Sequence, residues 1–379
     1  MMEELTGGFR AGRVVLLGSG ETSPSGRKAF EQVLQRFQQS PRVALLETPA
    51  GFELNSDMVI GRVADFLRHH LQNYRPLIET VAARKRGTPF SPDEEEIIAP
   101  LWRADVIFMG PGSPTYAVRQ LKNSLAWDIL LARHYLGADI VLASAATIAI
   151  SRFALPVYEI YKVGEELHWK DGLDFFGLYD LPLVFIPHWN NTEGGADLDT
   201  SRCFMGMARF ASLVKLLPPG ITIFGIDERT ALILDLATMT AKVVGQGSVT
   251  LIHCGEPHDD NEADTHEHKA LMDIARETGS HIHLFKQGET FPLSICCPFR
   301  IPRPGTGVRH TVWERALTFA EKKEQDEPIP PQVMEMVMAR EAARRARDWN
   351  TADQIRKSLE ASGWLVQDTP EGPHVKRCQ

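Results

Sequence analysis

Short apolar runs alternate with longer amphipathic stretches over residues 1–150, and this alternation constrains the fold more than any other feature. Strand-like runs stand at 13–17, 43–46, 106–109 and 140–143. Helical spacing of apolar residues occurs at 26–38 and 58–72. Strands that alternate with helices predict an α/β fold with a doubly wound, mostly parallel sheet. A further strand is predicted at 183–186, followed by a helix at 201–217.

The pattern changes after Gly220, where short apolar runs are separated only by turn residues. These runs, at 221–225, 230–234, 241–244 and 248–252, predict an antiparallel extension on one edge of the sheet. Helices are expected at 263–278 and 310–323, a strand at 281–285 and a loop at 298–307. The predicted organisation is a main domain at 1–255, its extension at 256–323, a charged, proline-rich linker at 324–331 and a small helical unit with a hairpin at 332–379.

Composition narrows the class of protein. The chain has 379 residues, of which 43% are hydrophobic and 24% charged, so a sizeable core is expected. A net charge of −8 argues against general coating of nucleic acids. No apolar stretch approaches the ~20 residues of a membrane span. Five cysteines without metal-type spacing are typical of a reduced, cytoplasmic protein.

Ser144 is the most suggestive candidate for chemistry. It ends the apolar run in Asp139-Ile-Val-Leu-Ala-Ser-Ala-Ala-Thr147, and small residues follow it. This pattern predicts a buried strand that turns sharply into a helix, with the serine above the carboxyl edge of the sheet, where open α/β folds bind ligands. The first N–H groups of a helix starting at Ala145 would face a developing oxyanion. A serine in an ordinary tight turn is the alternative interpretation.

A serine hydroxyl needs a base to take its proton, and a carboxylate to hold the tautomer of that base. His188, in Pro187-His-Trp-Asn-Asn191, is the candidate base, and Glu159 is the candidate orienting acid. Spacing alone does not bring these residues together. A histidine that caps a strand and a carboxylate on the surface would give the same pattern.

Two further patterns resemble ligand sites. The segment Met109-Gly-Pro-Gly-Ser-Pro114 would let the backbone approach a ligand, but neither it nor Gly18-Ser-Gly20 matches the dinucleotide fingerprint, and no cofactor is expected. A polar stretch contains His253, His258, His266 and His268. Its irregular spacing favours a solvated loop over a metal site, and no metal is expected.

Up to about residue 255 the chain resembles the serine peptidase family of aspartyl dipeptidase and cyanophycinase, peptidase family S51. Proteins of this family have the class I glutamine amidotransferase-like fold. The matching pieces are Gly18-Ser-Gly-Glu21, 104–112, Ala143-Ser-Ala145, Pro187-His188, 199–210 and Gly225-Ile-Asp-Glu-Arg-Thr-Ala231. The resemblance implies Ser144 as nucleophile and His188 as base, with the acid about fifteen residues after the serine, at Glu159.

The same resemblance implies further roles at the site. The oxyanion donors would be the amides of Gly112 and Ala145. Arg202 and Arg209 are candidates to hold a substrate carboxylate or to brace the site loop. An apparent insertion at 190–196 is polar and glycine-rich, as a substrate loop would be. Its candidate substrate-binding residues are Asn190, Asn191 and Glu193.

The turn around the serine departs from the family pattern. The family has Gly-x-Ser-Ala-Gly, whereas this chain has Leu142-Ala-Ser-Ala-Ala146, so both flanking glycines are missing. Alanine tolerates positive φ poorly, and a relaxed turn would weaken catalysis. A binding module on the same fold, catalytically altered, is therefore the alternative to a hydrolase.

The C-terminal tail resembles the end of cysteinyl-tRNA synthetase. It has a basic helix, a second helix carrying Ala-Asp-x-Ile-Arg, and a short hairpin with Asp-Thr-Pro-x-Gly. Arg340, Arg344 and Arg347 would share one helical face with Arg345 beside it, as phosphate contacts require. The tail is nearly neutral, so docking or formation of a homo-oligomer stays open beside contact with tRNA. The resemblance includes no aminoacylation machinery.

Together these observations predict a cytoplasmic serine hydrolase that acts on a small peptide or other amide and has no membrane partner. A binding module and a tRNA-associated protein are the alternatives.

Overall fold

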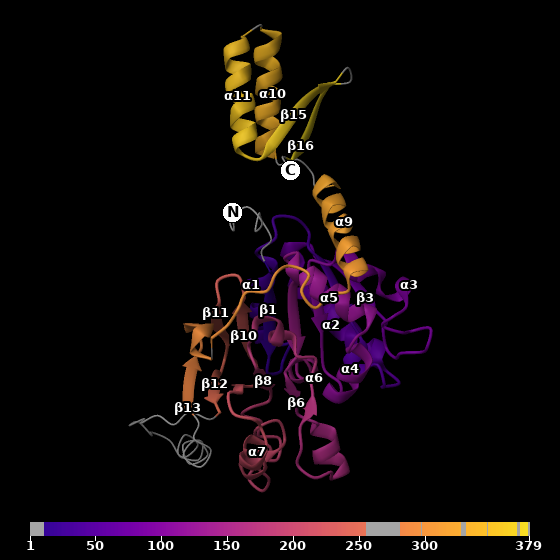
Figure 1. The fold of residues 1–379 in the computed structure, drawn as a ribbon, viewed down its shortest axis with the longest axis vertical. Helices are drawn as coiled ribbons and strands as arrows, with labels where there is room; N and C mark the ends of the chain where they lie inside the picture. The colour runs from indigo at the N-terminus through magenta and orange to yellow at the C-terminus, as the bar shows by residue number, and fades with distance from the viewer. Residues whose placement is uncertain are drawn as a thin grey trace. The chain divides into compact units, whose positions relative to one another are not determined.

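The computed structural model describes residues 11–254, 281–296, 298–326, 331–346, 348–369 and 372–377. The chain divides into two compact units, Met1–Ala316 and Leu317–Gln379. Figure 1 traces both along the sequence, and each is described here by itself. The expected helix at 263–278 lies outside the described residues.

The main unit is built on an eight-stranded sheet in the order β14-β11-β10-β1-β5-β4-β2-β3. Its strands are β1 Arg13–Leu17, β2 Arg42–Leu46, β3 Leu77–Val81, β4 Val106–Met109, β5 Asp139–Ala143, β10 Thr230–Asp235, β11 Thr240–Gly245 and β14 Thr290–Pro292. The strands from β1 to β3 pair in parallel, and β10, β11 and β14 pair antiparallel on the other side of β1. The predicted fold class is confirmed.

A second sheet of four strands has the order β13-β12-β9-β8. The strands are β8 Leu183–Ile186, β9 Thr222–Ile226, β12 Ser248–His253 and β13 His281–Lys286. The sequence predicted one antiparallel extension over 221–252, but the chain alternates between sheets there. β9 and β12 pair in the second sheet, whereas β10 and β11 join the main sheet. Because β9 and β10 are both almost wholly buried, their sequences do not reveal that they belong to different sheets.

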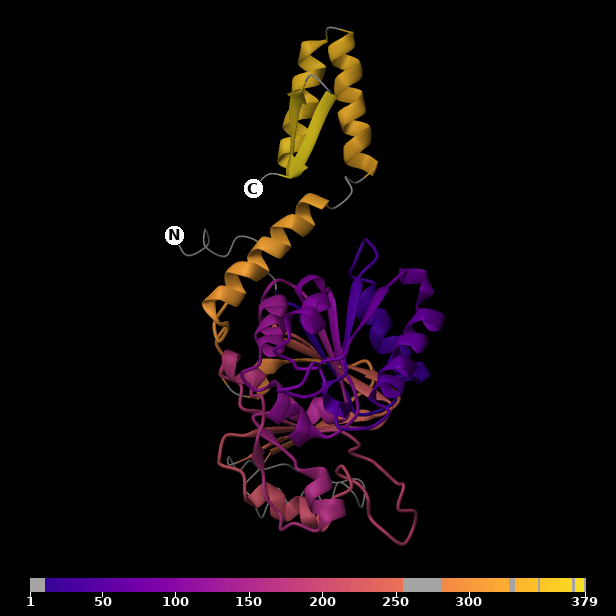
Figure 2. The same cartoon turned by 90° about the vertical axis from the view of Figure 1, so that its right-hand side faces the viewer.

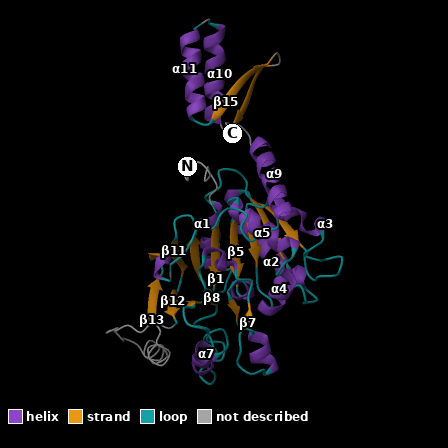
Figure 3. Ribbon diagram, viewed as in Figure 1, coloured by secondary structure: helices purple, strands orange, loops and turns teal. Residues whose placement is uncertain are grey.

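Helices pack against the main sheet. α1, Pro24–Leu34, and α2, Ser56–His70, pack their apolar residues on the sheet face that carries Val15, Val43 and Val141. The remaining helices of this unit are α3 Glu95–Ile98, α4 Pro114–Leu121, α5 Leu125–Tyr135, α6 Ala145–Ala149 and α7 Gly206–Lys215. Short helical turns are η1 Thr48–Ala50, η2 Gln72–Tyr74, η3 Ala99–Arg103, η4 Glu159–Val163, η5 Phe175–Tyr179 and η6 Leu293–Ile295. A small hairpin pairs β6 Phe153–Ala154 with β7 Lys170–Asp171. Figure 3 distinguishes these helices from the strands.

The division between the units falls within α9, His310–Asp326. Two helices and a hairpin follow it, namely α10 Pro331–Arg345, α11 Trp349–Ala361, β15 Trp364–Thr369 and β16 Gly372–Arg377. Their core consists of Val333, Val337, Leu359 and Trp364. Figure 2 shows the hairpin lying alongside the two helices. Helix α9 extends three residues into the expected linker at 324–331, and residues 327–330 lie outside the described part.

Among the described residues, no helix has the length and apolar character needed to span a bilayer.

Candidate active site

Ser144 lies where β5 turns into α6, at the carboxyl edge of the main sheet. It is the N-cap of α6 with φ 52° and ψ −110°, and its N–H donates to the carbonyl of Leu17 at 3.3 Å. Positive φ is uncommon for residues other than glycine and collects at functional sites. Ala145 and Ala146 are helical, so the strain falls on the serine itself. The missing flanking glycines therefore do not relax this turn.

His188 comes to the serine from the second sheet. It follows β8, and its Nε2 lies 2.9 Å from the Ser144 Oγ. Its backbone also has a positive φ of 50°, and its N–H donates to the carbonyl of Gly18 at 3.1 Å. The end of β1 and the residue after it thus hold the backbones of both residues, because Leu17 accepts from Ser144 and Gly18 accepts from His188. The structure therefore brings together the serine and histidine that the sequence proposed.

The carboxylate that meets the histidine is Glu228. It lies in the turn from β9 to β10, and its Oε1 is 2.9 Å from the His188 Nδ1. Asn191 donates to the same oxygen through Nδ2 at 2.9 Å, and the Asn190 Oδ1 accepts the Glu228 N–H at 2.8 Å. Both asparagines, which the sequence suggested as substrate-binding residues, form hydrogen bonds to Glu228 in the structure.

Hydrogen bonds keep Glu228 ionised. The bond from the His188 side chain lowers its pKa most, and the bond from Asn191 and the charges of His188 and Arg229 add to this effect against partial burial. A carboxylate with a depressed pKa stays an anion as the pH falls through the ordinary carboxyl range. The imidazole N–H at Nδ1 therefore has a charged acceptor at neutral pH.

Glu159, the acid that the sequence proposed, lies elsewhere. It begins η4, accepts a hydrogen bond from the Thr115 hydroxyl at 2.6 Å and lies 3.9 Å from the Lys170 ammonium. The glutamate that the structure places at His188 belongs to the segment Gly225-Ile-Asp-Glu-Arg-Thr-Ala231. The sequence feature that could have pointed to this glutamate is a tight acidic turn between two buried strands. That turn reaches His188 only because β9 pairs with β8 in the second sheet, a pairing that the linear pattern does not reveal.

Gly112 follows β4, which pairs with β5 in the register Met109 to Leu142, so its loop reaches the sheet edge beside Ser144. Its φ is 143°, and a Cβ there would stand 2.0 Å from the carbonyl oxygen of Pro49. Only glycine fits this position. In the described part of the chain, neither the Gly112 nor the Ala145 N–H donates to a backbone acceptor.

The other residues expected to bind substrate are scattered. Arg202 is 1% exposed and donates from Nη1 to the carbonyl of Trp189 at 2.8 Å. Its guanidinium thus contacts the loop that carries His188, and bracing this loop was one of its two expected roles. Arg209 is exposed on α7, and Glu193 is exposed on the loop after Asn191. The structure does not bring these three side chains together.

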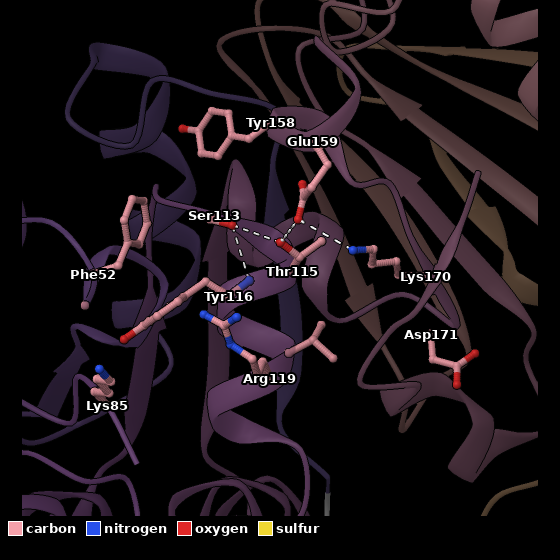
Figure 4. A pocket seen from close by; sticks show the side chains of 12 residues that line it. Phe52, Lys85, Ser113, Thr115, Tyr116, Arg119, Tyr158, Glu159, Lys170 and Asp171 are labelled. Atoms are coloured by element: carbon pink, nitrogen blue, oxygen red, sulfur yellow. Dashed lines mark hydrogen bonds and ion pairs between the residues drawn. The ribbon is translucent and has the colours of Figure 1, made fainter. Parts of the chain in front are cut away.

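A pocket of about 750 Å³ begins one residue beyond Gly112 (Figure 4). Its lining includes Phe52, Lys85, Ser113, Thr115, Tyr116, Arg119, Tyr158, Glu159, Lys170 and Asp171. Glu159 points toward Thr115 and Lys170 in this view. Within the described residues, neither Lys85 nor Arg119 forms an ion pair with a carboxylate, and the Arg119 guanidinium lies 5.1 Å from the centre of the Tyr116 ring. The pocket therefore offers positive charge beside aromatic surface.

Metal ligands do not gather in the part of the chain that the structure describes, where no group of three His, Cys, Asp or Glu residues is placed to hold an ion. His253 Nδ1 lies 3.0 Å from the hydroxyl of Thr222. The expected loop at His258, His266 and His268 lies outside the described residues.

The basic face predicted for the tail differs in the structure. Arg340 is 5% exposed and forms an ion pair with Glu341 at 2.8 Å, so it is not presented to a phosphate. α11 and the hairpin pack with α10 in the same small core, and the spacing of residues along α10 alone does not show which of its faces they cover. Arg344 is half-buried, Arg345 is exposed, and Arg347 lies outside the described residues.

Comparison with known proteins covers the two parts of the chain separately. A solved peptidase from an acI-B1 Actinobacterium has a TM-score of 0.55 with 19% sequence identity, and the match covers 75% of this chain and 98% of that one. This likeness shows the fold.

Residues 326–375 match the family model described as the cysteinyl-tRNA ligase anticodon binding domain. The cysteine–tRNA ligase of Methanosarcina mazei is 43% identical over 53 residues, which are 14% of this chain and 11% of the ligase. That of Rubrobacter xylanophilus is 46% identical over 48 residues, 13% of this chain and 10% of the ligase. The chain thus spans about one tenth of the length of these curated relatives. The protein joins a main unit with the fold of a peptidase to a C-terminal segment similar to the anticodon binding domain of cysteinyl-tRNA ligases.

Proposed function

We propose that the main unit is a serine hydrolase that cleaves a small peptide or another amide. The observation that carries this proposal is the hydrogen-bonded chain from the Ser144 Oγ through both ring nitrogens of His188 to the Glu228 carboxylate, 2.9 Å at each step. A serine, a base and an orienting acid in this order are the parts that acyl transfer requires. In the triad, Glu228 replaces the Glu159 of the sequence-based expectation.

Each group has one task in the reaction. The Ser144 oxygen attacks the carbonyl carbon while His188 accepts its proton at Nε2. Glu228 keeps the Nδ1 proton in place and stabilises the imidazolium, which then delivers a proton to the leaving amine. Water attacks the resulting acyl-serine with the same histidine as base. The second step releases the acid product and restores the serine hydroxyl.

The developing oxyanion needs fixed donors beside the serine. The amides of Gly112 and Ala145 are the proposed donors. The loop that carries Gly112 reaches the sheet edge next to Ser144, and Ala145 directly follows the serine. Backbone donors that already point at the site stabilise charge without reorganising, an effect worth about 3 kcal/mol per donor.

A fluorophosphonate probe tests the proposed function directly, since it reacts with an activated serine. The full-length protein should be labelled at Ser144, which peptide mass spectrometry can locate. Labelling should fail when the protein is unfolded beforehand. A folded protein that the probe leaves unmodified would favour the binding-module alternative.

The pocket in Figure 4 would receive the part of the substrate next to the scissile bond. Lys85 and Arg119 have no carboxylate partner among the described residues, so an anionic group of the substrate would compensate their charge. Arg119→Gln should raise KM about tenfold for an acidic substrate, with little change in kcat. Steady-state kinetics on matched acidic and neutral peptides measure this effect. An equal KM change for both peptides would contradict a charge contact.

A second function, contact with tRNA, is proposed for the C-terminal segment because residues 326–375 match an anticodon binding domain. Arg344 and Arg345 are the proposed phosphate contacts, together with Arg347, and Trp349 is 59% exposed nearby in sequence. Arg340 is left out because it is buried.

Replacing Arg344 and Arg345 together with glutamine should weaken tRNA binding and lower the salt slope by about two, one for each lost phosphate contact. Filter binding over a range of salt concentrations measures both. Arg356→Gln is the matched control, since Arg356 already lies near two carboxylates on α11. If the double variant binds tRNA normally but changes mass in light scattering, the segment serves docking or oligomerisation instead.

A further inference from the structure

A strained turn lies beside the candidate base. Arg202, Cys203 and Phe204 all have positive φ, at 56°, 58° and 68°. Three consecutive residues other than glycine in this region are unfavourable, and such a turn persists only when its surroundings hold it.

The turn donates hydrogen bonds to the backbone of the histidine and its neighbour. The Cys203 N–H reaches the carbonyl of His188 at 3.1 Å, and the Arg202 N–H reaches that of Trp189 at 2.8 Å. The Arg202 side chain gives the Trp189 carbonyl a second donor, Nη1, at 2.8 Å. Asn191 likewise gives the His188 carbonyl a second donor at 3.2 Å. Each of the two carbonyls next to the imidazole thus accepts two N–H groups.

The side chain of Arg202 is buried and stacks on the Trp189 indole. Its guanidinium carbon lies 4.2 Å from the centre of the Trp189 ring, and the two residues are 1% and 2% exposed. The indole packs directly over Gly225, where a Cβ would stand 2.3 Å from the nearest ring atom, and its ring meets Phe210 edge-on at 5.1 Å. The guanidinium is thus buried against the indole rather than presented on the surface.

We propose that Arg202 is a positioning residue for the reaction: it clamps the backbone at His188 and Trp189 and so holds the imidazole between Ser144 and Glu228. This inference rests on the proposed function. It assigns the arginine a role in the alignment of the base rather than in substrate binding. The planar guanidinium suits this role because it stacks on the indole and donates to the carbonyl at once, which a lysine ammonium cannot do equally well.

The test compares Arg202→Lys with Arg68→Lys, which changes an exposed arginine of α2 in the same way. A positioning role predicts that kcat falls on the order of 10-fold to 100-fold in Arg202→Lys, as expected for a misplaced catalytic group, while KM stays within about twofold. The surface control should match the wild type. A rise in KM at unchanged kcat would overturn the proposal in favour of substrate binding, and unchanged kinetics would also overturn it.

A readout without substrate separates this proposal from the proposed function. Proton NMR of the free protein should show a low-field resonance from the His188 Nδ1 proton, assigned by its loss in Glu228→Gln. We expect this signal to shift or broaden in Arg202→Lys and to stay unchanged in Arg68→Lys. A shifted signal in a protein that no serine probe labels would support the clamp while the hydrolase proposal fails. A sharp, unshifted signal would overturn the clamp whatever the activity.

If Arg202→Lys does not fold, Trp189→Phe provides the same comparison, because it keeps the carbonyl but reduces the surface under the guanidinium. Its resonance should move in the same direction by a smaller amount, and an unmoved resonance in the folded variant would overturn the proposal.

Discussion

Ser144→Ala should lower kcat on the order of 10⁴-fold or more, the scale of loss seen when a serine nucleophile is removed from a triad. The fold should survive, because alanine and serine both carry a Cβ and therefore face the same constraint at φ 52°. The loss is measured as the rate of hydrolysis of a peptide that the wild-type protein cleaves. Ser212→Ala, on the exposed side of α7, is the control and should keep full activity. Turnover that persists in the purified Ser144→Ala protein would remove the serine from the mechanism.

Glu228→Gln should have the second largest effect, lowering kcat by about 10²-fold to 10⁴-fold. The amide is nearly the same size but carries no charge, so it neither selects the Nδ1–H tautomer nor stabilises the imidazolium. KM should change little, since Glu228 contacts the base and two asparagines rather than the pocket. The measurement is a pair of steady-state profiles over pH for the wild type and the variant.

Glu159→Gln is the matched comparison for this second prediction, because it makes the same change at the acid first proposed from the sequence. Its kcat should stay within a few-fold of the wild type, with any larger effect in KM, since Glu159 lines the pocket. A large loss of kcat in Glu159→Gln, together with a normal kcat in Glu228→Gln, would restore Glu159 as the acid.

Local patterns were sufficient for much of the fold. The strands at 106–109 and 183–186 have the predicted bounds, because each is a short apolar run between clear turn residues. Ser144 and His188, which the structure brings within hydrogen-bond distance, could be proposed from the sequence because each stands at the end of such a run. β3 was missed because four of its five residues are exposed or half-exposed, which leaves little hydrophobic pattern.

What the sequence could not reveal depends on contacts between distant segments. Glu228 meets His188 only after β8 and β9 have paired, and nothing local marks that partner. Arg340 lies on an apparently basic helical face, yet packing within the C-terminal unit buries it. The contact of Glu228 and the burial of Arg340 therefore follow from tertiary packing, which residue spacing does not encode.

The three groups of the candidate triad come from three different places in the two-sheet arrangement: the main sheet carries the serine, the second sheet carries the histidine, and the connection from one sheet to the other carries the glutamate. Neither sheet alone contains all three groups. A nascent or refolding chain with only one sheet formed would therefore hold an unactivated serine, and reactivity would arise only once both sheets have docked. Because such long-range pairings form slowly, reaction of the serine with a probe would report when both sheets have come together during refolding.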